Sequence, residues 1–272
     1  MTHSAFGPTV SYEEAQRIER ETAQHLLNSR RLSLIVDLDQ TIVHATVDPT
    51  VGEWIAQGEA WEKGMVEREE RIRDREERKA LREERKRQKE LKAANDDDDD
   101  DDDSSDDSSD DSDDSDEEEE EPPSPNPNWA ALKDVKKFRL GPESLLSPNT
   151  KGKHKLIEAQ GCTYFVKPRP GWEQFFSSMA SKYEMHVYTM GTRAYAEEVC
   201  AAIDPDKKIF GGRILSRDES GSLTQKSLQR LFPCDTSMVV IIDDRADVWG
   251  WSPNLVKVIP CAYLFLLLNP GF

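Results

Sequence analysis

The chain has 272 residues and a formal net charge of −18 at pH 7. The charge is concentrated in Asp96–Glu121, which holds 20 acidic residues and six serines, whereas acids and bases nearly balance in the rest of the chain. This distribution argues against a basic nucleic-acid-binding surface, and the remaining core of about 155 residues is large enough for one domain.

The segment 1–30 is expected to form an N-terminal helix. Ser11 and Glu14 have the spacing of a capping box, in which the two side chains bond the free N–H groups of a first helical turn. We expect this helix to run to about Asn28.

The segment 31–54 contains an apolar, strand-like run that ends in Asp37 and Asp39, followed by Thr41. Asp is a poor strand residue, so two aspartates at the end of a buried strand require an explanation. One explanation is a turn or a helix cap. The other is a D-x-D-x-T phosphotransfer site, in which one carboxylate attacks phosphorus and both help to hold a divalent cation.

Two charged segments follow. In residues 55–95, Glu, Arg and Lys dominate, opposite charges recur four residues apart and no apolar heptad seam is present, which predicts a solvent-exposed single helix. Residues 96–128 are acidic and then proline-rich, which predicts a disordered linker. The linker could be a solubilising spacer, or its serines could be sites for acid-directed kinases.

Two further apolar runs in 129–260 end in polar residues: one is followed by Thr189, the other by Asp243 and Asp244. Such short apolar runs are typical of strands buried on both faces in a parallel sheet. Because ligands bind at the carboxyl ends of such strands, the four carboxylates should converge there and suit Mg²⁺. Lys226 could neutralise a phosphoryl group at this site. A surface lysine and an ordinary strand-end threonine remain the alternatives.

Helices are expected between these strands. One helix is predicted from five apolar residues with helical spacing, namely Trp172, Phe175, Phe176, Met179 and Tyr183. Another is predicted from Ala194 to Ile203, ending near Pro205. The alternation of strands and helices predicts an α/β fold with a parallel sheet.

Five runs of this sequence resemble the Fcp-type RNA polymerase II C-terminal-domain (CTD) phosphatases of the haloacid dehalogenase (HAD) superfamily. The resemblance covers about residues 31–54 and 129–260. It implies a HAD-like (Rossmannoid) parallel sheet with helices on both faces, to which the charged helix and the acidic insert are added. The runs are Asp37–Trp54, Lys167–Gly171, Tyr188–Ala196, Leu215–Leu223 and Asp243–Trp249.

The resemblance also implies roles for individual residues. Asp37 would be the nucleophile that forms an aspartyl-phosphate, and Asp39 would donate and then accept a proton. Mg²⁺ would be held by Asp37, by the backbone carbonyl of Asp39 and by Asp243, while Asp244 orients a metal-bound water.

Three further residues would be catalytic and substrate-binding: Thr189, Lys226 and Arg169. The first two would contact the transferred phosphoryl oxygens. Asp204 also matches a family position, although a structural acid at a helix terminus explains it equally well.

The implied substrate is phosphoserine in the C-terminal repeat domain of the RNA polymerase II largest subunit, which implies a nuclear location. The general transcription factor TFIIF is a further expected partner. No direct nucleic-acid binding and no membrane binding are expected.

Other function classes remain open. The chain could be a non-catalytic binding module on the HAD fold, or a scaffold whose acidic tract binds basic partners. Larger members of the family continue into a helical insertion and a BRCT domain, neither of which follows here. A truncated, poorly active phosphatase fragment is therefore a further alternative.

The sequence ends in a divergent tail, 261–272. Its apolar run, Ala262–Leu268, is too short to cross a membrane, and no signal peptide is expected at the start of the chain. The cysteines lack the Cys-x-x-Cys spacing of a zinc site, so free thiols in a reducing compartment are expected. They are Cys162, Cys200, Cys234 and Cys261.

Overall fold

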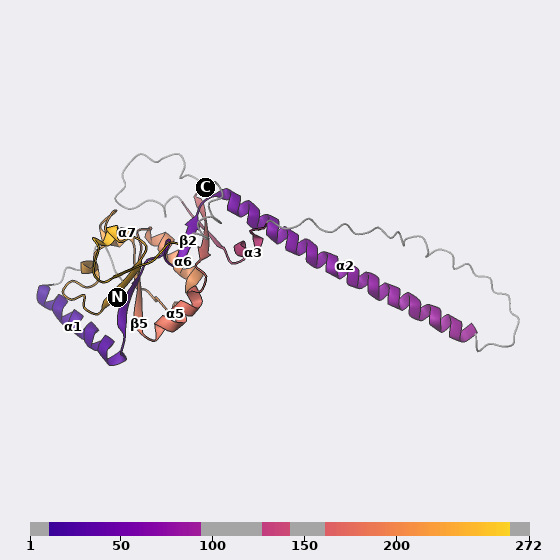
Figure 1. Ribbon diagram of the computed structural model, residues 1–272, viewed down its shortest axis with the longest axis horizontal. Helices are drawn as coiled ribbons and strands as arrows, with labels where there is room; N and C mark the ends of the chain where they lie inside the picture. Colours follow the sequence, from indigo (N-terminus) through magenta and orange to yellow (C-terminus); the bar gives the residue numbers. More distant parts are fainter. Residues whose placement is uncertain (1–10, 94–126, 142–160, 262–272) are drawn as a thin grey trace. The chain divides into compact units, whose positions relative to one another are not determined.

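The computed structural model describes residues 11–93, 127–141 and 161–261 (Figure 1). Most of the expected acidic linker and all of the tail beyond Cys261 lie outside the described residues. The chain divides into two compact units. One is formed by residues up to Glu53 and from Ala130 onward, and the other is Trp54–Trp129.

The first unit is built on a five-stranded sheet with the strand order β6-β5-β1-β7-β8. Every pair of neighbouring strands is parallel. The strand that carries the first aspartate motif is therefore at the centre. The strands are β1 (Leu32–Val36), β5 (Tyr183–Tyr188), β6 (Ile214–Leu215), β7 (Val239–Asp243) and β8 (Leu255–Lys257).

Both faces of this sheet are covered. Leu34 and Val36 pack in one apolar cluster with residues of α5 (Trp172–Ala180) and α6 (Arg193–Ile203), whereas Ile35 packs in a second cluster on the opposite face. In Figure 1, α1 lies on the side of the sheet away from α5 and α6. The predicted α/β fold is thus confirmed.

Serine and threonine caps begin two of these helices. The Ser11 hydroxyl accepts the Glu14 N–H at the start of α1 (Tyr12–Ser29), as predicted, although the Glu14 carboxylate pairs with Arg17. Thr192 caps α6 in the same way. The short helices α7 (Arg217–Ser220), η2 (Leu228–Arg230) and η3 (Asp247–Trp249) complete this part of the unit.

The prediction of one helix from Trp172 to Tyr183 was wrong at its end. The helix stops at Ala180, and Tyr183 is the first residue of β5. The spacing of Tyr183 from the helical residues matched a helical face, but this residue already pairs with Leu32 of the sheet.

A second, antiparallel sheet in the order β2-β4-β3 was not predicted. Its strands are β2 (Val43–Thr46), β3 (Lys136–Leu140) and β4 (Cys162–Pro168). Each outer strand pairs with β4, and the Phe138 ring of β3 stacks on Tyr164 of β4.

The second unit contains most of α2 (Pro49–Ala93), which begins six residues before the expected boundary at 55. Proline suits a first helical position because no N–H partner is needed there. Residues 71–91 are all exposed, as expected for a helix without an apolar face. At Gly58, a Cβ atom would lie 2.0 Å from the ring of Trp129, the first residue of α3 (Trp129–Leu132), so the absence of a side chain at Gly58 makes room for this ring.

Among the described residues, the helices that have the length to cross a membrane are too polar to do so.

Candidate active site

Asp37 and Asp243 are brought together by neighbouring strands. β1 and β7 run parallel with Val36 opposite Ile242, so the residues that follow lie side by side at the carboxyl edge of the sheet. The backbone continues this pairing, because the Asp37 N–H donates to the Ile242 carbonyl at 3.1 Å. This edge is where open α/β sheets bind their ligands.

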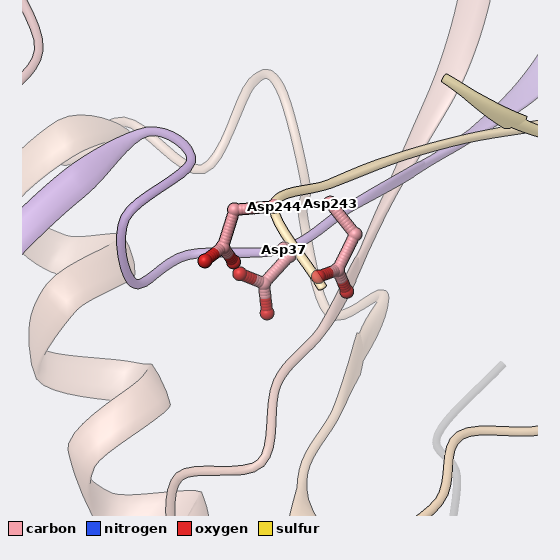
Figure 2. A group of neighbouring side chains, drawn as sticks. All are labelled: Asp37, Asp243 and Asp244. Atoms are coloured by element: carbon pink, nitrogen blue, oxygen red, sulfur yellow. The ribbon is translucent and has the colours of Figure 1, made fainter. Parts of the chain in front are cut away.

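Three carboxylates converge at this edge. Figure 2 shows Asp37 between Asp243 and Asp244, and one oxygen of each lies within 4.8 Å of the others. Asp37 and Asp243 are buried, and Asp244 is partly exposed. This donor set fits a divalent cation such as Mg²⁺, which prefers carboxylate oxygens and keeps other positions for water or phosphate.

Lys226 lies inside the carboxylate cluster. Its Nζ donates to Asp37 Oδ1 at 2.6 Å and to Asp243 Oδ2 at 2.7 Å. Burial alone would lower the pKa of Lys226, but the two carboxylates outweigh it and raise this pKa, so the side chain stays charged. The sequence predicted a lysine among the carboxylates. Lys226 is buried there, so the alternative of a surface lysine was wrong.

Two aromatic rings enclose the lysine. Nζ of Lys226 lies 5.6 Å from the ring centroids of both Tyr188 and Trp249, within the range of cation–π attraction. The Lys226 N–H also donates to the Val248 carbonyl at 2.8 Å, which fixes the backbone of this residue. The ammonium group is therefore held in a defined position between the two carboxylates and the two rings.

Asp37 is buried at the centre of these charges. Burial raises the pKa of Asp37 to about 7, even though Lys226 favours the ionised carboxylate. The charge of Asp243 also contributes to the raised pKa. A cation placed on the carboxylates would act in the opposite direction and favour ionised Asp37, the nucleophilic form of a carboxyl group.

Asp39 is the fourth carboxylate that was expected to converge here, but its carboxylate lies outside the group of three, in a different environment from Asp37. Its Oδ1 accepts a hydrogen bond of 2.5 Å from the Tyr195 hydroxyl. Burial raises the pKa of Asp39, and the Tyr195 hydrogen bond partly opposes this rise. Burial and the nearby Asp39 charge raise the pKa of Tyr195 well above its ordinary value, so its hydroxyl stays protonated at neutral pH and donates the hydrogen bond to Asp39. Gln40 follows with a φ of 61° and turns the chain away from the strand.

Thr189 directly follows β5, which is adjacent to β1 in the sheet. The residue is buried, and its Oγ1 accepts the Gly191 N–H at 3.0 Å. The threonine is therefore at the same sheet edge as the first aspartate motif, as the sequence predicted.

Arg169 and Asp204 contact the backbone. The Arg169 guanidinium donates to the carbonyls of Thr41 at 3.2 Å and Ile259 at 2.8 Å, so it braces the loop after the aspartates. The Asp204 carboxylate accepts the N–H groups of three residues beyond α6, which supports the structural interpretation of this acid. These residues are Lys208, Ile209 and Phe210.

No pattern in the sequence indicated that Tyr195 or Trp249 contacts the carboxylates. Trp249 Nε1–H donates to Asp243 Oδ2 at 2.7 Å, and the other Asp243 oxygen accepts the Arg245 N–H at 2.8 Å. Both aromatic residues lie in runs that resemble the Fcp-type phosphatases. Their place in these runs is the only sequence feature that could have identified them, because neither side chain carries charge at neutral pH.

Comparison with known proteins finds phosphatases among the relatives of this chain. Residues 143–263 match the family model described as NLI interacting factor-like phosphatase. The chain is 42% identical, over 262 residues, to the RNA polymerase II C-terminal domain phosphatase of Schizosaccharomyces pombe. The resemblance to the Fcp-type phosphatases is confirmed. The Saccharomyces cerevisiae protein of the same name is 38% identical over 255 residues.

These alignments cover 96% and 92% of this chain but only 25% and 26% of the Fcp-type relatives, so the chain spans about a quarter of their length. A solved structure of the fission yeast phosphatase Fcp1, bound to beryllium fluoride, is also similar. It has a TM-score of 0.58 and 40% identity, covering 90% of this chain and 45% of the solved one.

Proposed function

We propose that this chain is a Mg²⁺-dependent protein serine phosphatase that acts on phosphoserine in the C-terminal repeat domain of RNA polymerase II through an aspartyl-phosphate. The observation that carries the proposal is Lys226, held between Asp37 and Asp243 in a buried carboxylate cluster. A buried cation beside a carboxylate nucleophile suits transfer of an anionic phosphoryl group. The Fcp-type relatives carry the name of a CTD phosphatase.

In the first step, a carboxylate oxygen of Asp37 attacks phosphorus and the bond between phosphorus and the seryl oxygen breaks. Asp39 gives its proton to the departing seryl oxygen. The raised pKa of Asp39 favours this step, because the carboxyl group must be protonated before transfer.

In the second step, water attacks the phosphorus of the aspartyl-phosphate. Asp39, now ionised, accepts a proton from that water, and the bond between phosphorus and Asp37 breaks to release phosphate. One residue can serve as acid and then base because each proton transfer restores the form needed for the next.

Thr189, Lys226 and Arg169 complete the proposed catalytic and substrate-binding set. The Thr189 hydroxyl and the Lys226 ammonium group bind phosphoryl oxygens. Arg169 uses two of its five N–H groups on backbone carbonyls, and its remaining N–H groups are the ones that would contact substrate oxygens.

The proposed metal site consists of Asp37, the backbone carbonyl of Asp39, and Asp243, with Asp244 orienting a metal-bound water. When bound, Mg²⁺ supplies positive charge for the carboxylates and the transferred phosphoryl oxygens. The carboxylates outnumber the one lysine in the cluster, which supports a need for a cation. The beryllium fluoride bound by fission yeast Fcp1 is consistent with a site for phosphoryl groups.

The phosphorylated repeat domain as substrate, a nuclear location and an association with TFIIF are parts of the same proposal. The names of the Fcp-type relatives support the substrate, and a nuclear role follows from it. TFIIF follows from the family resemblance alone.

The deciding experiment measures hydrolysis of p-nitrophenyl phosphate by the purified chain. We expect activity with Mg²⁺, loss of activity with EDTA, and recovery when Mg²⁺ is added in excess. A phosphoserine peptide with the polymerase repeat should be hydrolysed under the same conditions. Hydrolysis that persists in EDTA would contradict the metal requirement. A chain that binds the phosphopeptide without hydrolysing either compound would instead be a binding module.

Replacing Trp249 with Phe should weaken Mg²⁺ binding. The substitution keeps an aromatic ring but removes the N–H that orients Asp243. Loss of such a supporting hydrogen bond typically costs about 10–100-fold in metal affinity. The Mg²⁺ concentration that gives half-maximal activity should rise by this factor. The matched control is Trp251→Phe, because Trp251 is 74% exposed. Equal Mg²⁺ requirements in the two variants would contradict the role of Trp249.

A further inference from the structure

Tyr195 contacts the residue that the proposed function uses for proton transfer. Its hydroxyl donates to Asp39 Oδ1 at 2.5 Å, which joins α6 to the loop after β1 across 156 positions of sequence. A carboxylate held at one oxygen has a restricted plane, and this restriction also fixes the direction of its second oxygen.

The Tyr195 ring is held on several sides. Its centroid lies 5.2 Å from that of Tyr164 and 6.1 Å from that of Phe138, and these two rings stack on each other at 5.4 Å. The Tyr195 N–H donates to the helix-capping hydroxyl of Thr192 at 3.3 Å. The antiparallel sheet and the first turn of α6 therefore fix the hydroxyl in place.

Gly191 makes room for this ring. A Cβ atom at Gly191 would lie 2.5 Å from Cδ1 of Tyr195 and 3.4 Å from Oγ1 of Thr189. The Gly191 N–H also bonds Thr189. One turn thus positions both the threonine proposed to bind phosphate and the tyrosine that contacts Asp39.

A buried tyrosine hydroxyl needs a hydrogen-bond partner in any case, so the contact alone could be structural. A structural role and a role in proton transfer differ in their consequences. Loss of a structural contact affects all substrates alike, whereas misplacement of a proton donor affects substrates according to their need for a proton.

We propose that Tyr195 is a positioning residue that aims the Asp39 carboxyl group at the seryl oxygen and then at the hydrolytic water. This inference rests on the proposed function. Tyr195 keeps its own proton in both steps. Asp39 gives its proton to the seryl oxygen as the phosphorus–oxygen bond breaks, and it regains a proton from the water that releases phosphate.

The test compares Tyr195→Phe with the wild-type chain on two substrates. A phosphoserine peptide has a poor leaving group that requires protonation, whereas 2,4-dinitrophenyl phosphate releases a stable phenolate without it. We expect kcat/KM for the phosphopeptide to fall about 10–100-fold, because small misplacement of a catalytic group has effects of this order. The value for dinitrophenyl phosphate should change less than threefold.

Rapid mixing provides a second readout. In Tyr195→Phe, hydrolysis of the aspartyl-phosphate still needs Asp39 as a base, so dinitrophenolate should appear in a burst of about one equivalent per enzyme, followed by slow turnover. The matched control is Tyr164→Phe, which removes a hydroxyl from the same aromatic cluster and keeps both the ring and the Tyr195–Asp39 contact. It should behave as wild type.

Equal losses on both substrates without a burst, at an unchanged melting temperature, would overturn the positioning role, as would wild-type rates for Tyr195→Phe on the phosphopeptide. Failure of the proposed function has a different outcome, because the wild-type chain would then hydrolyse neither compound with Mg²⁺.

Discussion

Asp37→Asn should abolish turnover of both aryl phosphates and phosphoserine peptides. The amide keeps the shape of the side chain and can still accept a hydrogen bond from Lys226, but it lacks the anionic oxygen that forms the bond to phosphorus. Loss of a nucleophile lowers kcat by at least about 10⁴-fold. Steady-state assays with Mg²⁺ measure the loss, and a circular dichroism spectrum shows whether the fold is retained.

The matched control for this variant is Asp206→Asn. Asp206 is an exposed aspartate that pairs with Lys208 on the surface, and its replacement should leave kcat unchanged. If Asp37→Asn retained several per cent of the wild-type rate after rigorous purification, the covalent mechanism would be wrong.

Asp39→Asn should have the next largest effect. The variant loses proton transfer, which typically contributes 10²–10⁴-fold, while its amide oxygen can still accept the Tyr195 hydrogen bond. With 2,4-dinitrophenyl phosphate the first step needs no proton donor, so the aspartyl-phosphate should form and persist. Intact-protein mass spectrometry after acid quenching should show the addition of one phosphoryl group.

The same mass measurement on the Asp37→Asn variant should show no phosphoryl group, which makes it the negative control. A fast turnover of the aryl phosphate by Asp39→Asn, with no accumulated phosphoenzyme, would rule out Asp39 as the base in the second step.

The sequence was most informative where burial on both faces made a run of residues uniformly apolar. β1 and β7 come close to this pattern, with Ser33 as the one polar residue before Asp37 and Asp243, and it predicted their parallel arrangement. The convergence of Asp37 and Asp243 then requires only that both residues lie at the carboxyl ends of these strands. The sequence predicted Lys226 as a neutralising charge at this site. Its contacts with both carboxylates could not be predicted, because they depend on how the loop before β7 folds.

The sequence was less informative where structure depends on contacts between distant segments. β4 was not recognised as a strand, because only its last four residues are buried and its first three are partly exposed. The hydrogen bond from Tyr195 to Asp39 joins residues that share no periodic pattern, so no spacing rule could reveal it. The helix ending at Ala180 was overextended for a related reason: helical spacing does not show where a turn begins.

The antiparallel sheet determines how the core accommodates the long segment between β2 and β3. β2 ends at Thr46 opposite Phe165, and β3 starts at Lys136 opposite Val166, so the chain leaves and returns on either side of two adjacent residues of β4. Two interstrand spacings amount to roughly 10 Å, whatever the length of chain in between. Within this segment, residues 71–91 of α2 are all exposed, whereas Val51 and Leu132, near the two strand ends, are buried. Residues 71–91 can therefore be shortened or replaced without moving Asp37, provided that the strand ends and their buried neighbours are kept.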